Sequence, residues 1–457
     1  ESAIYTPSAV TITGFGTVNF SGTTNVDFIN LTAVDVRTAT ANDTLSMSNG
    51  ATVTNGGTVP GGYALAPAAA LVVSGAGAPI VAIRNATTLT IDPTTGGGDG
   101  NDTINFGTNT GATAGVTNLI ANTGVGPDVI NVSGTLAFSG DVTLGSGGAI
   151  VDGNGATLNL SANVVVLTAA GGINLDTDIA SLTATTSVAG TIQIREANAI
   201  TLTDIHTADG SITITAGGTV TAISVTDFLD ASHAISITTT SGDILVDLIQ
   251  ATGDTVTLDA AGAIEEINGD GTADLIAHIL NLTSVTGIGA AGTIEINTIT
   301  TASRGLTANV TGTGPIDLSD VGGGLRVRSV SGDMIVESVI AGSSSDATLT
   351  AVAGAITDGN AVGTDITAGT TTLVASTGIG TSGDPLEVNA ATFTNWQTAT
   401  GGIFIDIHDV GNVTRTVTNA SATASGDIIF TSTVGGGSNA NVFQSVVAAN
   451  GNIDISR

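Results

Sequence analysis

Three closely related stretches decide the fold of this chain: SGDILV begins at Ser241, SGDMIV at Ser331 and SGDIIF at Ser425. The first two copies continue in parallel, since LDAAGAI ends at Ile264 and LTAVAGAI ends at Ile356. The phrases SVTGIGAAG and VASTGIGTSG then follow, so the two copies keep an offset of about 90 residues. A repeat of this kind, rich in Gly, Ile, Val and Thr, predicts stacked β-structure in which each coil covers the apolar face of the previous coil.

A shorter pattern indicates the form of one coil: a Gly, a small or polar residue, then alternating Ile, Val or Leu. Copies are GDVTL at Gly140, GGINL at Gly171, GTIQI at Gly190, GSITI at Gly210, GTIEI at Gly292, GPIDL at Gly314 and GNIDI at Gly451. Neighbouring copies often lie roughly 20 to 30 residues apart, which suits a parallel β-helix. The alternation predicts Ile and Val inside and Thr, Asn and Asp outside. We expect the Gly at a corner with a positive φ.

The composition agrees with an all-β chain. There are 63 Gly among 457 residues, only 3% of residues are aromatic, and the eight basic residues are all Arg. Prolines concentrate in the N-terminal part, so we expect residues 1–135 to form an irregular or sandwich-like segment richer in Pro, Ala and Asn. Residues 136–457 are expected to form a repetitive β-solenoid whose repeats start near residues 241, 331 and 425.

Charge limits the partners of the chain. A net charge of −31 disfavours nucleic acid and anionic membrane surfaces, and the segment at residues 44–83 is too rich in Pro and Gly to predict a membrane-inserted helix. The lack of Lys excludes a P-loop and Schiff-base chemistry, and there is no Cys for a thiolate metal site. Cations and neutral surfaces are the expected partners.

A calcium-type turn stands at residues 97–105, which read GGDGNDTIN. This motif resembles the repeats-in-toxin nonapeptide GGxGxDxUx, in which turn carbonyls and the Asp carboxylate bind Ca²⁺ between coils. A degenerate copy, GVGPDVIN, follows at residues 124–131, and NDTLS at Asn42 is a weaker echo. The resemblance implies a Ca²⁺ site at Asp99, Asn101, Asp102 and Asp128. The alternative is that Asp, Gly and Asn simply form a good turn.

Other motifs have a structural alternative. GIGAAG at residues 287–292 and GIGTSG at residues 378–383 match the dinucleotide fingerprint GxGxxG, but strand-like sequence follows each, which predicts corner turns. The string DIHD at Asp406 suggests a metal or acid–base role, although isolated His residues on strands are usually structural. The pair Glu265–Glu266 points to opposite faces of a strand and cannot act as one carboxylate pair. No catalytic or cofactor-binding residue is expected, and we do not expect an enzyme.

Residues 136–457 resemble the large repetitive surface proteins of bacteria, namely filamentous-haemagglutinin-like and autotransporter-like adhesins and giant exoproteins with AGAI and TGIG phrases. The resemblance implies a right-handed parallel β-helix that is secreted and displayed on the bacterial cell surface. We therefore expect an acidic extracellular rod that is a subunit or section of a surface filament, surface layer or adhesin stalk. Self-association into a fibre or layer and binding of host or neighbouring-cell glycans are the expected interactions. The alternative is a carbohydrate-binding or carbohydrate-cleaving β-helix, which requires carboxylates with Trp396 or a Phe on one exposed face.

Overall fold

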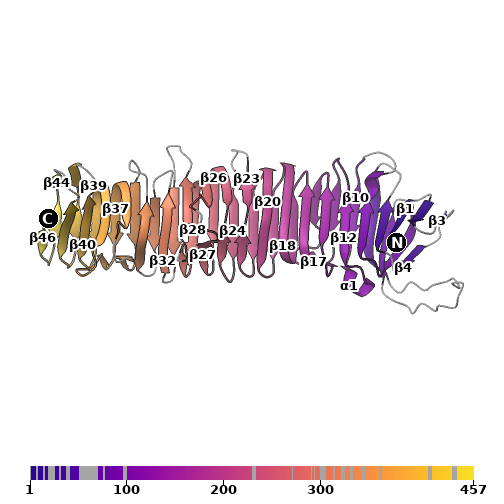
Figure 1. Ribbon diagram of the computed structural model, residues 1–457, viewed down its shortest axis with the longest axis horizontal. Helices are drawn as coiled ribbons and strands as arrows, with labels where there is room; N and C mark the ends of the chain where they lie inside the picture. The colour runs from indigo at the N-terminus through magenta and orange to yellow at the C-terminus, as the bar shows by residue number, and fades with distance from the viewer. Residues whose placement is uncertain are drawn as a thin grey trace. The chain divides into compact units, whose positions relative to one another are not determined.

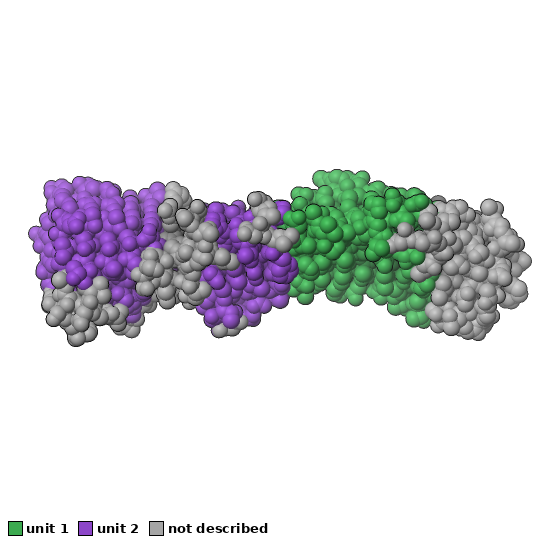
Figure 2. Space-filling view, turned by 90° about the horizontal axis from the view of Figure 1, so that it is seen from above, with its two compact units in different colours: residues 1–216 green, residues 217–457 purple. Residues whose placement is uncertain are grey.

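A computed structural model describes residues 2–456 except 7–8, 14–15, 19–25, 30–31, 38–41, 51–69, 76–77, 96–99, 229–232, 270, 290, 293, 299–304, 312–313, 321–324, 330–332, 341–345, 360–362, 410–413 and 435–439. These residues form a parallel β-solenoid of about 13 turns with a mixed N-terminal sheet region, which confirms the predicted fold class. The chain divides into two compact units, residues 1–216 and 217–457 (Figure 2). Within each unit, successive coils place their strands side by side (Figure 1).

The described residues of the first unit form 21 strands and two short helical turns. They are β1 (Ser2–Thr6), β2 (Ala9–Thr13), β3 (Gly16–Val18), β4 (Val26–Ile29), β5 (Ala33–Arg37), β6 (Thr44–Gly50), β7 (Ala70–Gly75), β8 (Ala78–Arg84), β9 (Thr88–Asp92), η1 (Pro93–Thr95), β10 (Thr103–Phe106), β11 (Asn109–Thr110), α1 (Gly111–Ala114), β12 (Asn118–Asn122), β13 (Val129–Val132), β14 (Leu136–Ala137), β15 (Val142–Ser146), β16 (Ala149–Asp152), β17 (Leu160–Ala169), β18 (Ile173–Ala189), β19 (Ile192–Glu196), β20 (Ile200–Asp209) and β21 (Ile212–Ala216).

In the second unit, the part that the structure describes forms 25 strands. They are β22 (Val220–Ala222), β23 (Val225–Asp227), β24 (Ile235–Thr239), β25 (Ile244–Val246), β26 (Ile249–Asp259), β27 (Ala263–Glu266), β28 (Leu275–Ser284), β29 (Gly287–Ile288), β30 (Ile294–Thr298), β31 (Gly305–Val310), β32 (Gly314–Asp320), β33 (Leu325–Ser329), β34 (Met334–Ile340), β35 (Asp346–Ala351), β36 (Ala355–Asp358), β37 (Ile366–Ala375), β38 (Gly378–Ile379), β39 (Leu386–Thr398), β40 (Ile403–Asp409), β41 (Thr414–Val417), β42 (Ala420–Ala422), β43 (Ile428–Val434), β44 (Ala440–Phe443), β45 (Val446–Ala448) and β46 (Ile453–Ile455).

Strand pairing in the first unit changes from mixed near the N-terminus to parallel further along the chain. Near the N-terminus, β1 pairs with β2, β2 with β3, β6 with β7 and β7 with β8 in antiparallel fashion. From β9 onward, the described strand pairs of this unit are parallel, for example β10 with β13 and β19 with β21. The N-terminal strands therefore form the mixed region, and the regular coils follow it.

The core of each coil comes from strict alternation along its strands. In β19 and β21 every second residue is buried, and the inward residues of β19 pair in register with those of β21. Ile192 pairs with Ile212 and Ile194 pairs with Ile214, and all four side chains are 0% exposed. Burial of one such side chain is worth about 1.5–3 kcal/mol relative to exposure. A column of Ile residues therefore holds successive coils together.

The Asp of the SGD phrase links one coil to the next. The carboxylate of Asp243 accepts a hydrogen bond from the backbone N–H of Ala263 at 2.8 Å. Asp333 accepts in the same way from Ala355 at 2.8 Å, and Asp427 accepts from the N–H of Asn452 at 2.8 Å. The SGD phrase therefore recurs because its Asp accepts a hydrogen bond from a backbone N–H at the corner of the following coil. At this corner the N–H would otherwise have no partner in the strand ladder.

The expectation that the recurring Gly needs a positive φ is wrong at several positions. Gly171, Gly190 and Gly210 do not have φ in the left-handed region. Gly is required there because the coils stack closely: a Cβ on Gly190 would overlap the backbone of Gly171, and a Cβ on Gly210 would overlap the backbone of Gly190. The glycines thus form a column in which the backbones of neighbouring coils are in contact.

Aromatic residues gather in the core of the second unit. Trp396 is 0% exposed and packs edge-on against Phe393, with ring centroids 4.5 Å apart. Its other neighbour is Phe430, at 5.5 Å, and the indole Nε1 donates to Thr371 Oγ1 at 3.3 Å. Trp396 therefore fills the core of the solenoid and does not form an aromatic platform at the surface. Among the described residues, no helix has the length and apolarity needed to cross a membrane.

Candidate functional site: two carboxylate triads

A cluster of three carboxylates lies in the first repeat of the second unit. Glu266 ends β27, Asp274 immediately precedes β28, and Glu295 lies in β30. One carboxylate oxygen from each residue lies within 4.8 Å of the other two. Asp274 is only 2% exposed, while Glu266 and Glu295 are half-buried. We call these residues the first triad.

The second repeat carries the same cluster at the corresponding positions. Asp358 ends β36, Asp365 precedes β37 and Glu387 lies in β39, and their carboxylate oxygens also lie within 4.8 Å of one another. These residues follow those of the first triad by 91 or 92 residues, which is the repeat length. Asp365 is 0% exposed. We call these residues the second triad. Over the described part of the chain, only these two groups meet the geometry of a carboxylate or histidine metal cluster.

Backbone contacts fix the central Asp and the following Glu in the same way in both triads. The N–H of Asp274 donates to the carbonyl of Glu295 at 2.7 Å, and the N–H of Glu295 donates to Asp274 Oδ2 at 2.9 Å. In the second triad, the N–H of Asp365 donates to the carbonyl of Glu387 at 3.0 Å, and the N–H of Glu387 donates to Asp365 Oδ2 at 2.7 Å. The triads are therefore positioned by the stacking of neighbouring coils.

Burial dominates the electrostatics of the second triad. It raises the pKa of Asp365 to about 9, and a hydrogen bond to Glu387 and the charge of Asp358 add to this effect. Burial also raises the pKa of Glu387, although the hydrogen bond from Asp365 opposes the rise. Asp365 therefore keeps a proton at neutral pH and shares it with Glu387. A divalent cation would supply the positive charge that this proton now provides.

A histidine lies beside the second triad. The strand β40 places Asp406 opposite Glu387 in the register, and His408 stands two residues further along. His408 Nδ1 lies 2.8 Å from Thr364 Oγ1, and the positive charge of His408 lowers the pKa of Glu387 against the larger effect of burial. The DIHD string is thus at a carboxylate cluster, although His408 itself is not within the triad.

Three oxygen-bearing side chains from successive segments suit a hard cation. Ca²⁺ takes six to eight oxygen ligands from carboxylates, carbonyls and water, while Mg²⁺ keeps most of its waters. Three carboxylates carry a charge of about −3 when all are ionised, which a divalent ion neutralises in large part. Each triad could therefore hold a metal ion.

The site predicted from the nonapeptide differs from the two triads, because its described Asp residues stack one above another in successive coils. Asp99 lies outside the described residues. Asp102 and Asp128 are both 1% exposed and stack in successive coils, because the N–H of Asp102 donates to Asp128 Oδ1 at 2.8 Å. Asp43 extends this stack, since its N–H donates to Asp102 Oδ1 at 2.7 Å. The exposed Asn101 uses its own N–H to bond the side chain of Asn42 at 2.7 Å. Ca²⁺ at this place stays a prediction.

The triads were missed because their members are far apart in the sequence. Glu265 and Glu266 are separated, as strand alternation predicts: Glu265 accepts a hydrogen bond from the N–H of Ala291 at 2.7 Å, whereas Glu266 joins the first triad. A signal was present, since an acidic residue follows AGAI in both repeats and a Glu follows TGIG in both. Comparison of acidic positions between the two copies would have found it.

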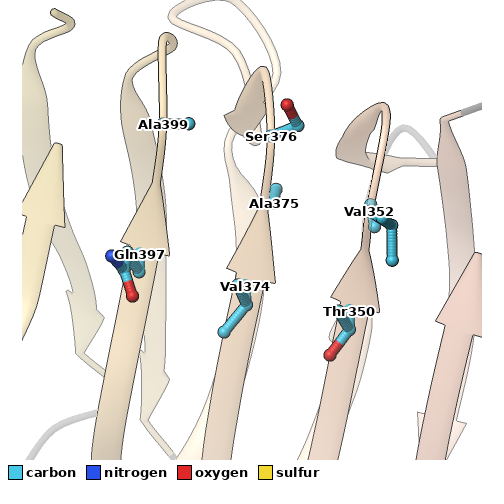
Figure 3. A pocket seen from close by; sticks show the side chains of 8 residues that line it. Thr350, Val352, Val374, Ala375, Ser376, Gln397 and Ala399 are labelled. Carbon is cyan, nitrogen blue, oxygen red and sulfur yellow. The ribbon is translucent and has the colours of Figure 1, made fainter. Parts of the chain in front are cut away.

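A shallow groove of about 310 Å³ crosses three coils of the second unit. Thr350, Val374 and Gln397 occupy paired positions on β35, β37 and β39 and line it, together with the turns that follow these strands (Figure 3). The lining contains no titratable or aromatic side chain. The groove therefore offers no groups for catalysis and no ring on which a sugar could stack.

Comparisons of the chain with protein-family models, with curated proteins and with solved structures find no significant match. The β-solenoid fold and the two triads are accordingly the features from which a function must be argued.

Proposed function

We propose that this chain is a section of an extracellular structural or adhesive β-solenoid of the bacterial cell surface, and that Ca²⁺ bound at the triads ties its coils together. The net charge of −31 supports a soluble, cation-binding surface. The resemblance of residues 136–457 to repetitive surface proteins supports display outside the cell. Self-association into a fibre or layer and contact with glycans are the interactions that such a role predicts.

The recurrence of the triad carries the proposal. A buried carboxylate cluster destabilises a fold unless a proton or a cation compensates for it. The second repeat nevertheless keeps an acidic residue at all three positions, although the loop between β36 and β37 differs in sequence from the loop between β27 and β28. A cluster that costs stability and still recurs is best explained by a ligand. Calcium fits because the donors of both triads are all carboxylate oxygen atoms.

Calorimetric titration of the purified chain with Ca²⁺ tests the proposal. We expect the triads to contribute two sites in the native chain, one in Glu266→Ile, one in Asp365→Asn and none in the double variant, while any Ca²⁺ bound at Asp102 and Asp128 is common to all four proteins. Asp204→Asn is the matched control, because Asp204 is an exposed carboxylate of the first unit outside both triads. A native chain that takes up no Ca²⁺, or a double variant that binds as the native chain does, would refute the assignment.

Electron microscopy of the negatively stained protein with and without EGTA tests self-association separately. Filaments that shorten or come apart under chelation would support a Ca²⁺-dependent polymer. Single particles of uniform size in both conditions would exclude self-assembly of this chain. An adhesive role without polymerisation would then be examined with a glycan array.

The carbohydrate-active alternative loses Trp396 as an aromatic platform, although Phe228 is 63% exposed. Trp396 is 0% exposed and Phe393 and Phe430 pack around it in the core, so none of these rings faces a sugar at the surface. The proposal therefore rests on the solenoid and the triads, without a catalytic step.

A further inference from the structure

An Asn followed by Gly is prone to spontaneous deamidation. The backbone nitrogen of the Gly attacks Cγ of the Asn side chain, a C–N bond forms, and the side-chain nitrogen leaves as ammonia with the proton from the Gly nitrogen. Water then opens the five-membered succinimide ring to Asp or to isoaspartate. Gly favours the attack because it has no Cβ in the way. The reaction needs an accessible turn and a Gly N–H that is not held in a hydrogen bond.

Asn268–Gly269 meets these conditions. Both residues are exposed and lie in the turn between β27 and β28. Gly269 has a φ of 60°, and no heavy atom of the described residues beyond its chain neighbours lies within 4 Å of the position that a Cβ would take. The side-chain amide of Asn268 donates to Asp247 Oδ1 at 2.6 Å.

The other Asn–Gly pairs in the described part of the chain are restrained by hydrogen bonds, by packing or by strand pairing. The N–H of Gly155 donates to Asp152 Oδ1 at 3.0 Å, so the attacking nitrogen after Asn154 is engaged. Gly451 packs against the backbone of Gly426, and the side chain of Asn450 donates to the carbonyl of Ala424 at 2.7 Å. The pair at residues 49–50 lies within β6, which is paired with β7.

The equivalent turn of the second repeat lacks the pair. The residues there are Asp358, Gly359 and Asn360, so Asn follows Gly. The N–H of Gly359 also donates to the carbonyl of Val336 at 2.8 Å. The two repeats therefore differ in this reaction although they share the triad.

We propose that Asn268 is a site of spontaneous deamidation that ages the first repeat and leaves the second unchanged. The product places a carboxylate at hydrogen-bond distance from Asp247, where an amide donor stood, and like charges at that distance repel. The isoaspartate form also lengthens the backbone between Glu266 and Asp274 by one methylene group. The turn that joins two members of the first triad is displaced in either case. The loss of a cation site is the part of the inference that rests on the proposed function.

Peptide mapping by mass spectrometry tests the modification itself. The full chain is incubated in warm buffer at neutral and mildly alkaline pH, sampled over time and digested, and isoaspartate is measured with an isoaspartyl methyltransferase. We expect conversion at residue 268 on the order of tenfold faster than at Asn154 or Asn450. The N–H of Gly155 must first break a hydrogen bond, and the backbone of the neighbouring coil restricts Gly451, whereas Gly269 has open space around it. The rate should rise with pH, and Asn268→Gln should abolish the signal at this position. An intact residue 268, or conversion at 154 or 450 at an equal rate, overturns the inference.

Calcium titration of fresh and aged protein tests the consequence. We expect the aged chain and the variant Asn268→Asp each to lose one of two sites, while Asn268→Gln keeps both after the same incubation. If fresh protein binds no Ca²⁺, the proposed function fails while the mapping result still decides the modification. If aged protein is modified and yet keeps both sites, the link from the turn to the first triad is refuted.

Discussion

Replacement of Asp365 by Asn should remove a large pH dependence of stability. Asp365 is 0% exposed, and burial with the neighbouring acids raises its pKa to about 9, against about 3.9 for an Asp in an unfolded chain. Between these values the folded chain holds a proton that the unfolded chain has lost, so the free energy of unfolding falls as pH rises. For one proton the slope is about 1.4 kcal/mol per pH unit.

The magnitude follows from that slope. From about pH 5 to about pH 8 the native chain should lose up to about 4 kcal/mol without a divalent cation. Glu387 acts in the same direction, because burial raises its pKa too. The Asn variant keeps the size of the side chain but has no proton to lose at residue 365, so its slope should be shallower than the native slope by up to about 1.4 kcal/mol per pH unit, while the part due to Glu387 remains.

Urea unfolding in EGTA at several pH values measures the effect. Trp396 is the single Trp of the chain, is buried and lies on β39 with Glu387, so its fluorescence reports this region. Asp384→Asn is the control, because Asp384 is exposed and should leave the native slope unchanged. Calcium should restore stability, and more strongly at higher pH, since it replaces a proton. A variant with the native slope, or a native chain without one, refutes the reasoning.

Three further substitutions test how the coils hold together. Asp243→Ala removes the acceptor of the N–H of Ala263 and should lower the free energy of unfolding by about 1–3 kcal/mol in urea titrations. Asp243→Asn should cost less because it keeps an oxygen acceptor, and equal losses would contradict the proposed role of this hydrogen bond. Gly190→Ala should lower stability by about 1–3 kcal/mol in thermal melts followed by circular dichroism, because its Cβ would meet the neighbouring coil. Gly383→Ala has open space and should be neutral, and a similar loss there would refute the stacking argument. Trp396→Ala should cost about 3–5 kcal/mol by the same assay, and a neutral outcome would mean that the aromatic core is loosely packed.

The coils were predictable because their determinants are local. Alternation in segments such as residues 190–196 places Ile192 and Ile194 inward whatever their partners are, and the structure has both at 0% exposure. Asp102 and Asp128 lie 26 residues apart, which is close to one coil, and they do stack in successive coils. The role of the glycines was not predictable from local sequence, because a positive φ and close packing both favour Gly. Only the distance between neighbouring coils distinguishes the two causes.

The triads depend on the register between strands of successive coils, which can be inferred from the sequence only indirectly. Asp274 and Glu295 meet because β28 pairs with β30 so that Leu275 lies opposite Ile296. In the second repeat one extra residue stands in the turn between β38 and β39, and the register is kept, since Ile366 lies opposite Val388. An offset that changes from 91 to 92 residues within one repeat hides the equivalence from a search at fixed spacing.

The third partial copy separates the scaffold from the site. Its Asp427 keeps the coil-to-coil hydrogen bond that Asp243 and Asp333 make in the first two copies, so this bond belongs to the fold. The register then places Ile455 opposite Phe430, at the position that Glu266 and Asp358 hold in the other copies. The solenoid therefore accepts an apolar residue where two copies have a carboxylate. Since coil stacking does not require an acid at this position, the acid in the first two copies is better explained by what the triad binds than by how the chain folds.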